Sequence, residues 1–207
     1  WTTFTTDAAS KVTSFSYDPN GNLLITTDPK LNKVTMAYDL KGRKISMNDP
    51  DMGAWIYSYD ALGQLKSQRD AKLQTTTMVY DLLGRMTRRN EPSLISNYYY
   101  DKYADNAACN KGIGKLCEVT ANNGYRRKHY YDALARTNRT DNYVEGATAF
   151  HQIDTTFDTL GRVDTVTYPA VTIGAATTRL AVKNNYNGAG YLYSITNPTG
   201  TLAYWTA

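Results

Sequence analysis

Hydrophobic and polar residues alternate along most of the chain with a period of two. Val34, Met36 and Tyr38 fall on one side of an extended segment, whereas the residues between them fall on the other. The segments 55–59 and 76–80 repeat this pattern. A period of two is typical of β-strands, and no long stretch keeps the 3.6-residue period of an amphipathic helix. We therefore expect an all-β protein with almost no helix.

A short motif recurs along the chain, in which an aromatic residue is followed by Asp and then, three residues after the Asp, by Gly. The first four copies begin at positions 17, 38, 59 and 80, so they lie 21 residues apart, and later copies are spaced more widely by insertions. The residues of the clear copies are Tyr17, Asp18, Gly21, Tyr38, Asp39, Gly42, Tyr59, Asp60, Gly63, Tyr80, Asp81, Gly84, Tyr131, Asp132, Phe157, Asp158 and Gly161. Repeats of this length indicate an array of small structural units.

The motif predicts a turn between two strands. Asp at the first position and Gly at the fourth fit a type I turn whose last residue is left-handed. A second set of turn signals lies between the motifs, for example at 27–35 and 69–76. Each repeat therefore supplies two strands of about six residues, and the chain about 15 strands in total. Ala135 replaces the Gly in one copy, so we expect a different turn geometry there.

The number of strands restricts the architecture. Open twisted sheets of more than about ten strands tend to curl, split or close. We expect an antiparallel β-hairpin array that forms a curled ribbon, with regular units over 1–100 and units with insertions over 101–207. The chain opens and stops in mid-pattern, so we expect one array, 1–207, excised from a larger protein. Its edge strands would be open to edge-to-edge self-association.

The motif copies resemble the repeats of the Rhs and YD-repeat family, whose units carry Tyr-Asp-x-x-Gly-Arg-Leu. Copies such as YDLKGRKIS, which begins at Tyr38, and YDLLGRMTR, which begins at Tyr80, show the resemblance, which covers nearly the whole chain. It implies part of a hollow β-shell, as in the B and C components of Tc toxins, Rhs toxins and teneurins. In bacterial members the shell encloses a C-terminal toxin domain. The resemblance thus implies a secreted or cell-surface parent of bacterial origin, whose partners are adjacent repeats and a toxin or other cargo domain.

The sequence departs from the family in two further places. Asp101 is followed by an insertion, after which Gly114-Lys115-Leu116 is similar to a delayed Gly-Arg-Leu. The family's self-cleaving Asp-Pro-x-Gly segment has no match, because NPTGT at 197–201 lacks the acidic residue. No protease residues are therefore carried over to this chain.

The insertion holds both cysteines of the chain, Cys109 and Cys117, which lie eight positions apart. They flank its turn, and a disulfide there would suit an oxidising compartment. Two unpaired thiols in a cytosolic protein remain the alternative. A zinc site needs about four ligands, and only His129 and His151 could join the cysteines, so we expect no metal and no cofactor.

The acidic residues of the motif do not indicate catalysis. They recur in every copy, as a turn residue does and a unique catalytic residue does not, and neither His belongs to a recognisable triad. We expect a non-catalytic structural segment that encloses and insulates a cargo, and not an enzyme. The alternative is a carbohydrate-binding or adhesion module, in which exposed rows of Tyr rings stack on glycans and gain strength by avidity.

The charge balance argues against two other classes of partner. Lys and Arg number 23 against 19 Asp and Glu, for a net charge of +4, and no run of like charge reaches five residues. This distribution is typical of a mixed, solvated surface, so we expect no nucleic-acid partner. We expect the densest basic spots, Arg88–Arg89 and Arg126–Lys128, to lie on a solvated outer face. The chain also lacks an apolar run of about 18 residues, so we expect no membrane insertion by this segment.

Overall fold

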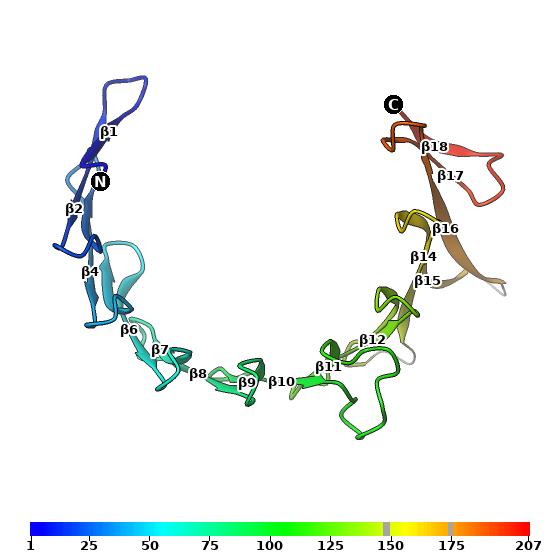
Figure 1. The fold of residues 1–207 in the computed structure, drawn as a ribbon, viewed down its shortest axis with the longest axis horizontal. Coiled ribbons are helices and arrows are strands. Elements are labelled where there is room, and N and C mark those ends of the chain that lie inside the picture. The colour runs from blue at the N-terminus through cyan, green and yellow to red at the C-terminus, as the bar shows by residue number, and fades with distance from the viewer. Residues whose placement is uncertain (147–149, 174–175) are drawn as a thin grey trace. The chain divides into compact units, whose positions relative to one another are not determined.

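The chain is an all-β protein in a computed structural model that describes residues 1–146, 150–173 and 176–207. All regular secondary structure in these residues is antiparallel β-sheet, which confirms the predicted hairpin array. The chain divides into two compact units, Trp1–Ile95 and Ser96–Ala207. Within each unit, successive hairpins follow one another along a ribbon (Figure 1).

In the first unit, each strand pairs with the next one in the chain. Its strands are β1 (Phe4–Thr6), β2 (Val12–Tyr17), β3 (Leu23–Thr27), β4 (Lys33–Tyr38), β5 (Lys44–Asp49), β6 (Gly53–Tyr59), β7 (Leu65–Arg69), β8 (Thr75–Tyr80) and β9 (Met86–Asn90). Most have the predicted length of about six residues. The register shifts by one residue just before each motif Tyr, for example between Ser58 and Tyr59. This bulge is the start of the motif turn.

The second unit follows the same order of pairing, with longer connections. Its strands are β10 (Ile95–Tyr100), β11 (Leu116–Ala121), β12 (Arg126–Tyr131), β13 (Thr137–Tyr143), β14 (His151–Phe157), β15 (Val163–Ile173), β16 (Ala176–Tyr186), β17 (Leu192–Thr196) and β18 (Ala203–Thr206). Strands β15 and β16 have 11 residues each, which is longer than expected. Pro169 falls where their register shifts, between Thr167 and Ala170. A proline lacks the N–H that a ladder needs, and a bulge accommodates it without ending the strand.

The ribbon is one sheet thick and has almost no apolar core. Side chains alternate along β6, where Trp55, Tyr57 and Tyr59 are half-buried and the residues between them are exposed. Among the described residues, Cys109 and Cys117 are the only fully buried apolar side chains. Stable domains normally bury one face of a sheet against a second layer. Here stability has to come from contacts between neighbouring hairpins.

None of the described residues forms a helix of the length and apolarity that crossing a membrane requires.

Candidate functional site: the inter-repeat ladder and the disulfide-closed loop

The Asp of each motif closes its own turn. The N–H of Gly42 donates to the carbonyl oxygen of Asp39 at 2.9 Å. One carboxylate oxygen of Asp39 accepts the N–H groups of Lys41 and Arg43, at 2.9 and 3.0 Å. The other carboxylate oxygen accepts from Nε of Arg43 at 2.7 Å. The same pairing with an Arg four residues later occurs at Asp81, Asp132 and Asp158. A carboxylate whose oxygens are used in this way has a structural role.

These bonds favour the ionised carboxylate. The backbone N–H of Arg43 and its side chain lower the pKa of Asp39, and the pKa of Asp18 is lowered first by the side chain of Asn22. The side chain and backbone of Arg136 do the same to the pKa of Asp132. Hydrogen bonds to the charged form of an acid favour that form.

We expect the array to lose stability in acid for this reason. Because the pKa of the folded carboxyl lies below the unfolded value of 3.8, the stabilisation by the ionised carboxylate is fully present above pH 3.8. The stability is lost as the pH falls through the folded pKa. Thermal unfolding measured between about pH 5 and pH 2 should show the melting temperature falling steadily. In Asp39→Asn and Asp132→Asn variants this fall should be smaller, and an unchanged pH profile would contradict the assignment.

The motif Arg also reaches the next repeat. The guanidinium of Arg43 lies 4.7 Å from the centre of the Tyr59 ring, and its NH1 donates to the carbonyl oxygen of Asp60 at 3.3 Å. In the second unit, Arg136 lies over Phe157 at 4.1 Å and Arg162 over Tyr186 at 4.2 Å. A cation over an aromatic face is attracted by the ring quadrupole. One Arg therefore caps its own turn and holds the following one, and we call this arrangement the inter-repeat ladder.

The motif Tyr connects its repeat to the preceding one, whereas the motif Arg contacts the following one. The hydroxyl of Tyr59 donates to the carbonyl oxygen of Lys44 at 2.8 Å, and that of Tyr80 to Leu65 at 2.9 Å. Tyr131 and Tyr186 make equivalent bonds in the second unit. Each acceptor is the first residue of the return strand in the preceding hairpin. The motif rings are half-buried. These four hydroxyls are bonded to backbone, whereas the hydroxyl of Tyr38 contacts the sulfur of Met36 at 3.7 Å.

Removal of one such hydroxyl tests the ladder. Tyr59→Phe should lower the free energy of unfolding by about 1 kcal/mol, since the carbonyl of Lys44 loses its side-chain donor. Urea unfolding measures this as a lower midpoint with an unchanged slope. The matched control is Tyr191→Phe, because Tyr191 is largely exposed and should tolerate the change. Equal effects at both positions would contradict the ladder.

The turn at Ala135 corrects a prediction from the sequence. A different geometry was expected where Ala replaces Gly, but Ala135 has a φ of 57° and its N–H bonds to the carbonyl oxygen of Asp132 at 3.0 Å. The turn is the same as in the other copies. The bonds from Leu134, Arg136 and its side chain to the Asp132 carboxylate hold it in place. They offset the steric cost of a left-handed Ala, which is about 1 kcal/mol.

Ala135→Gly should therefore stabilise the second unit. Gly removes the clash between Cβ and the backbone, with a gain of about 0.5–1 kcal/mol after the entropy of the unfolded Gly is counted. Thermal unfolding should show a higher midpoint. Leu134→Gly, one position earlier in the same turn, should give no gain, because Leu134 does not have a positive φ.

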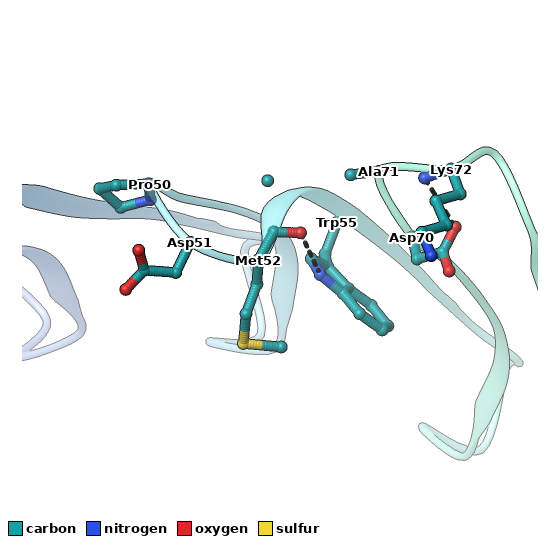
Figure 2. A pocket seen from close by; sticks show the side chains of 8 residues that line it. Pro50, Asp51, Met52, Trp55, Asp70, Ala71 and Lys72 are labelled. Atoms are coloured by element: carbon teal, nitrogen blue, oxygen red, sulfur yellow. Dashed lines mark hydrogen bonds between the residues drawn. The ribbon is translucent and has the colours of Figure 1, made fainter.

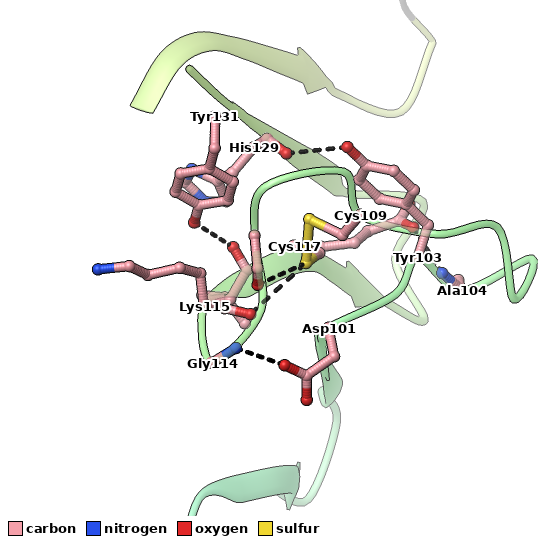
Figure 3. Close-up of a disulfide and its surroundings, with 12 residues drawn as sticks. Asp101, Tyr103, Ala104, Cys109, Gly114, Lys115, Cys117, His129 and Tyr131 are labelled. Carbon is pink, nitrogen blue, oxygen red and sulfur yellow. Dashed lines mark hydrogen bonds between the residues drawn. A yellow bond between two sulfur atoms is a disulfide. The ribbon is translucent and has the colours of Figure 1, made fainter. Parts of the chain in front are cut away.

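The insertion after Asp101 forms a loop whose two ends meet at the position of a motif turn. The N–H of Asp101 donates to the carbonyl oxygen of Lys115 at 3.2 Å, so Gly114-Lys115-Leu116 occupies the place of Gly-Arg-Leu. Cys109 and Cys117 are joined by a disulfide in the structure, with their Cα atoms 6.0 Å apart (Figure 3). Both are nearly inaccessible to solvent, at 2% and 0%. The disulfide is thus the most buried apolar group among the described residues.

The same loop covers a buried carboxylate on β11. Glu118 is 0% exposed, and its oxygens accept from the N–H of Ala104 at 2.8 Å and from Nε of Arg126. Tyr103 completes the cover, because its hydroxyl donates to the carbonyl oxygen of His129 at 3.1 Å (Figure 3) and its ring lies under Lys128. We call Tyr103, Ala104, Glu118, Arg126 and Lys128 the loop cluster.

A second buried acid lies next to this cluster. Asp141 on β13 is paired with Arg139 through two bonds of 2.7 and 2.8 Å. Burial, and then the hydrogen bond with Asp141, raise the pKa of Tyr130 to about 12. Burial also lowers the pKa of His129, with a further contribution from Arg127. These shifts favour a neutral Tyr130 and a neutral His129 at neutral pH. The two buried carboxylates have cationic partners, Arg126 for Glu118 and Arg139 for Asp141.

Only some residues of the predicted basic spots lie on a solvated face. Arg88 and Arg127 are exposed, as expected. The expectation is wrong for three others, since Arg89 pairs with Glu91 at 2.8 Å, Arg126 with Glu118, and Lys128 with Asp105 at 3.7 Å. Cations paired in this way are half-buried and are not a free basic surface. Within the described parts of the chain, no group of three or more His, Cys, Asp or Glu could hold a metal ion.

Sequence reasoning missed both the ladder and the loop cluster. The ladder had a visible signal, because Arg recurs four residues after the Asp, at 43, 85, 136 and 162. Its second role, on the next aromatic ring, depends on strand register. The loop cluster had no signal, because Glu118 and Arg126 are unremarkable charged residues until the loop covers them.

Comparison with known proteins supports the family that the repeats indicate. The Teneurin YD-shell family model matches residues 3–108, about half of the chain. No curated protein matches. Among solved structures, a mutant Tc holotoxin pore of Photorhabdus luminescens is 18% identical over 94% of this chain, with a TM-score of 0.49. The crystal structure of TcdB2–TccC3 is 14% identical over 94% of this chain, with a TM-score of 0.39. This chain spans 9% and 15% of those two chains.

Proposed function

This chain belongs to the Teneurin YD-shell family, and we propose that it is a non-catalytic stretch of shell wall that encloses and insulates a cargo domain. The observation that carries the proposal is the use of the repeated polar groups. Motif carboxylates close turns, most motif hydroxyls bond to backbone, and motif Arg side chains connect hairpins. Groups used in this way support a role as a wall, and within the described residues they form no repeated reactive site.

The thickness of the ribbon supports the same role. The described residues form a single sheet without a second layer, which leaves both faces to be covered or solvated. Large apolar side chains such as Leu40, Leu62 and Leu83 are exposed at the turns. Exposed apolar groups of this kind are typical of surfaces that meet other protein. In the proposed shell, their partners are adjacent repeats and the enclosed domain of a longer, secreted or cell-surface protein of bacterial origin.

Protease protection of the parent protein tests enclosure. A cargo domain enclosed by an intact shell should resist a protease that digests the same domain when it is expressed alone. Loosening the wall with Arg126→Ala should shorten that resistance, and Arg127→Ala, at an exposed neighbour, should not. If the cargo domain of the intact parent is digested as fast as the isolated domain, enclosure is wrong.

The structure gives no support to the alternative of a glycan-binding array of Tyr rows. That role needs motif rings that stand free of the sheet. The rings of Tyr59, Tyr80 and Tyr131 are half-buried, and their hydroxyls are bonded to the preceding hairpin. The repeated Tyr is explained by the ladder.

A further inference from the structure

Trp55 on β6 is a departure from the repeat that the ladder does not explain. The residue four places before the motif Tyr is Val34 in the preceding repeat, Trp55 here and Thr76 in the next. The turn and the ladder therefore do not require an aromatic residue at this place. The ring of Trp55 is nonetheless held in one orientation, because its Nε1 donates to the carbonyl oxygen of Met52 at 3.3 Å.

Two hollows meet at this ring. One, of about 450 Å³, lies between the turns of Asp51–Met52 and Asp70–Lys72, with the indole of Trp55 between them (Figure 2). The other, of about 210 Å³, is lined by Gln68, Gln74, Thr76, Arg89 and Glu91. Trp55 and Asp70 line both. Tyr57 stacks with Trp55, with a centroid distance of 6.3 Å and an angle of 17° between the rings.

The walls of these hollows hold polar groups that the fold does not use. One oxygen of Asp70 caps its turn by accepting from the N–H groups of Lys72 and Gln74. Its other oxygen has no partner among the described residues, whereas the corresponding oxygen of Asp28 accepts from the side chain of Asn32. The side-chain amides of Gln68 and Gln74 are also without partners in the described part of the chain. Nε of Arg89 is buried and makes no hydrogen bond there.

The charges of the lining restrict the ligand. Three carboxylates, of Asp51, Asp70 and Glu91, face two cations, of Lys72 and Arg89. A net negative lining disfavours phosphates and acidic sugars. An apolar ligand would leave the unused amides and carboxylate buried without partners, at a cost for each of them. A neutral ligand with one flat apolar face and many hydroxyls satisfies both conditions.

We propose that Trp55 and the two hollows bind a neutral oligosaccharide, with one pyranose ring stacked on the indole. The ring's C–H face would contact the aromatic surface. Its hydroxyls would donate to the free oxygen of Asp70 and exchange bonds with the amides of Gln68 and Gln74, which can donate and accept at once. The smaller hollow lies below the usual 300–1,000 Å³ range for drug-sized ligands and suits a single sugar unit.

Titration with defined sugars tests the site. The probes are the neutral tetrasaccharides cellotetraose, chitotetraose and maltotetraose, and the acidic comparison is a trimer of galacturonic acid. Calorimetry and ligand-observed NMR should give saturable binding of at least one neutral probe, with a dissociation constant of about 1 mM. Trp55→Ala should weaken it about tenfold or more. Gln68→Ala should also weaken it, and this variant alters an amide that the fold does not use.

The matched control is Trp205→Ala, which removes an exposed Trp in the second unit and should leave binding unchanged. Three results would overturn the proposal: no neutral probe binding up to about 10 mM, equal binding by the wild type and a folded Trp55→Ala variant, or tighter binding of the acidic trimer. The sugar site is independent of the shell role. Neither binding nor its absence therefore affects the outcome of the protease-protection test.

Discussion

Arg126→Ala is expected to destabilise the second unit by about 3 kcal/mol, the largest effect of any single substitution described here. The variant leaves the Glu118 carboxylate fully buried beneath the loop without its cation. An unpaired buried charge is far more costly than an unpaired exposed one, and the partial exposure of Arg126 places the effect at the low end of the usual range.

Chemical unfolding followed by circular dichroism measures this loss. Arg127→Ala, at the exposed neighbouring position on β12, is the control and should change stability by less than about 0.5 kcal/mol. A double variant, Glu118→Gln with Arg126→Met, should recover part of the loss, because it removes both charges while keeping similar volumes. If the single and double variants are equally unstable, the buried pair is not the cause.

Opening the disulfide is expected to cost about 2.5 kcal/mol and to expose the insertion loop. Cys109 and Cys117 close a loop with a sequence separation of 8. The entropy lost by closing such a loop in the unfolded chain accounts for about this amount. The double variant Cys109→Ser, Cys117→Ser also places hydroxyls in a site that excludes solvent, which adds to the cost.

Hydrogen exchange locates the effect. Amides of Lys102–Glu118 should exchange faster in the double variant or after reduction, while those of the first unit should not change. Exchange that is equally slow with and without the disulfide would contradict the assigned role of the loop. Two free thiols in protein prepared without reductant would contradict the pairing itself.

Much of the fold followed from local pattern. Alternation at Val34, Met36 and Tyr38 was enough to identify a strand, because side chains of a strand point to opposite faces in turn. The spacing of Asp39 and Gly42 was enough to place the turn after it. Both are decided within a few residues, so the sequence predicted them without knowledge of the partner strands.

The errors arose where side-chain contacts, and not periodicity or propensity, decide the outcome. At Ala135 the sequence pattern predicted a changed turn, but the Asp132–Arg136 cap holds the backbone in the left-handed region. Arg89 was expected on a solvated face, yet it pairs with Glu91 at 2.8 Å. Burial of Glu118 depends on the path of an insertion with no regular pattern. Propensity and periodicity describe neither the path of such a loop nor contacts across strand register.

The central claim is that these repeats are the wall of a shell that encloses another part of the parent protein. A cryo-electron microscopy map of the parent protein tests it most directly. The account predicts that residues 1–207 form part of a closed wall, with motif ladders continuous from hairpin to hairpin and polypeptide density on the enclosed side. A map in which this segment is an open ribbon, with solvent on both faces and no enclosed polypeptide, would contradict it.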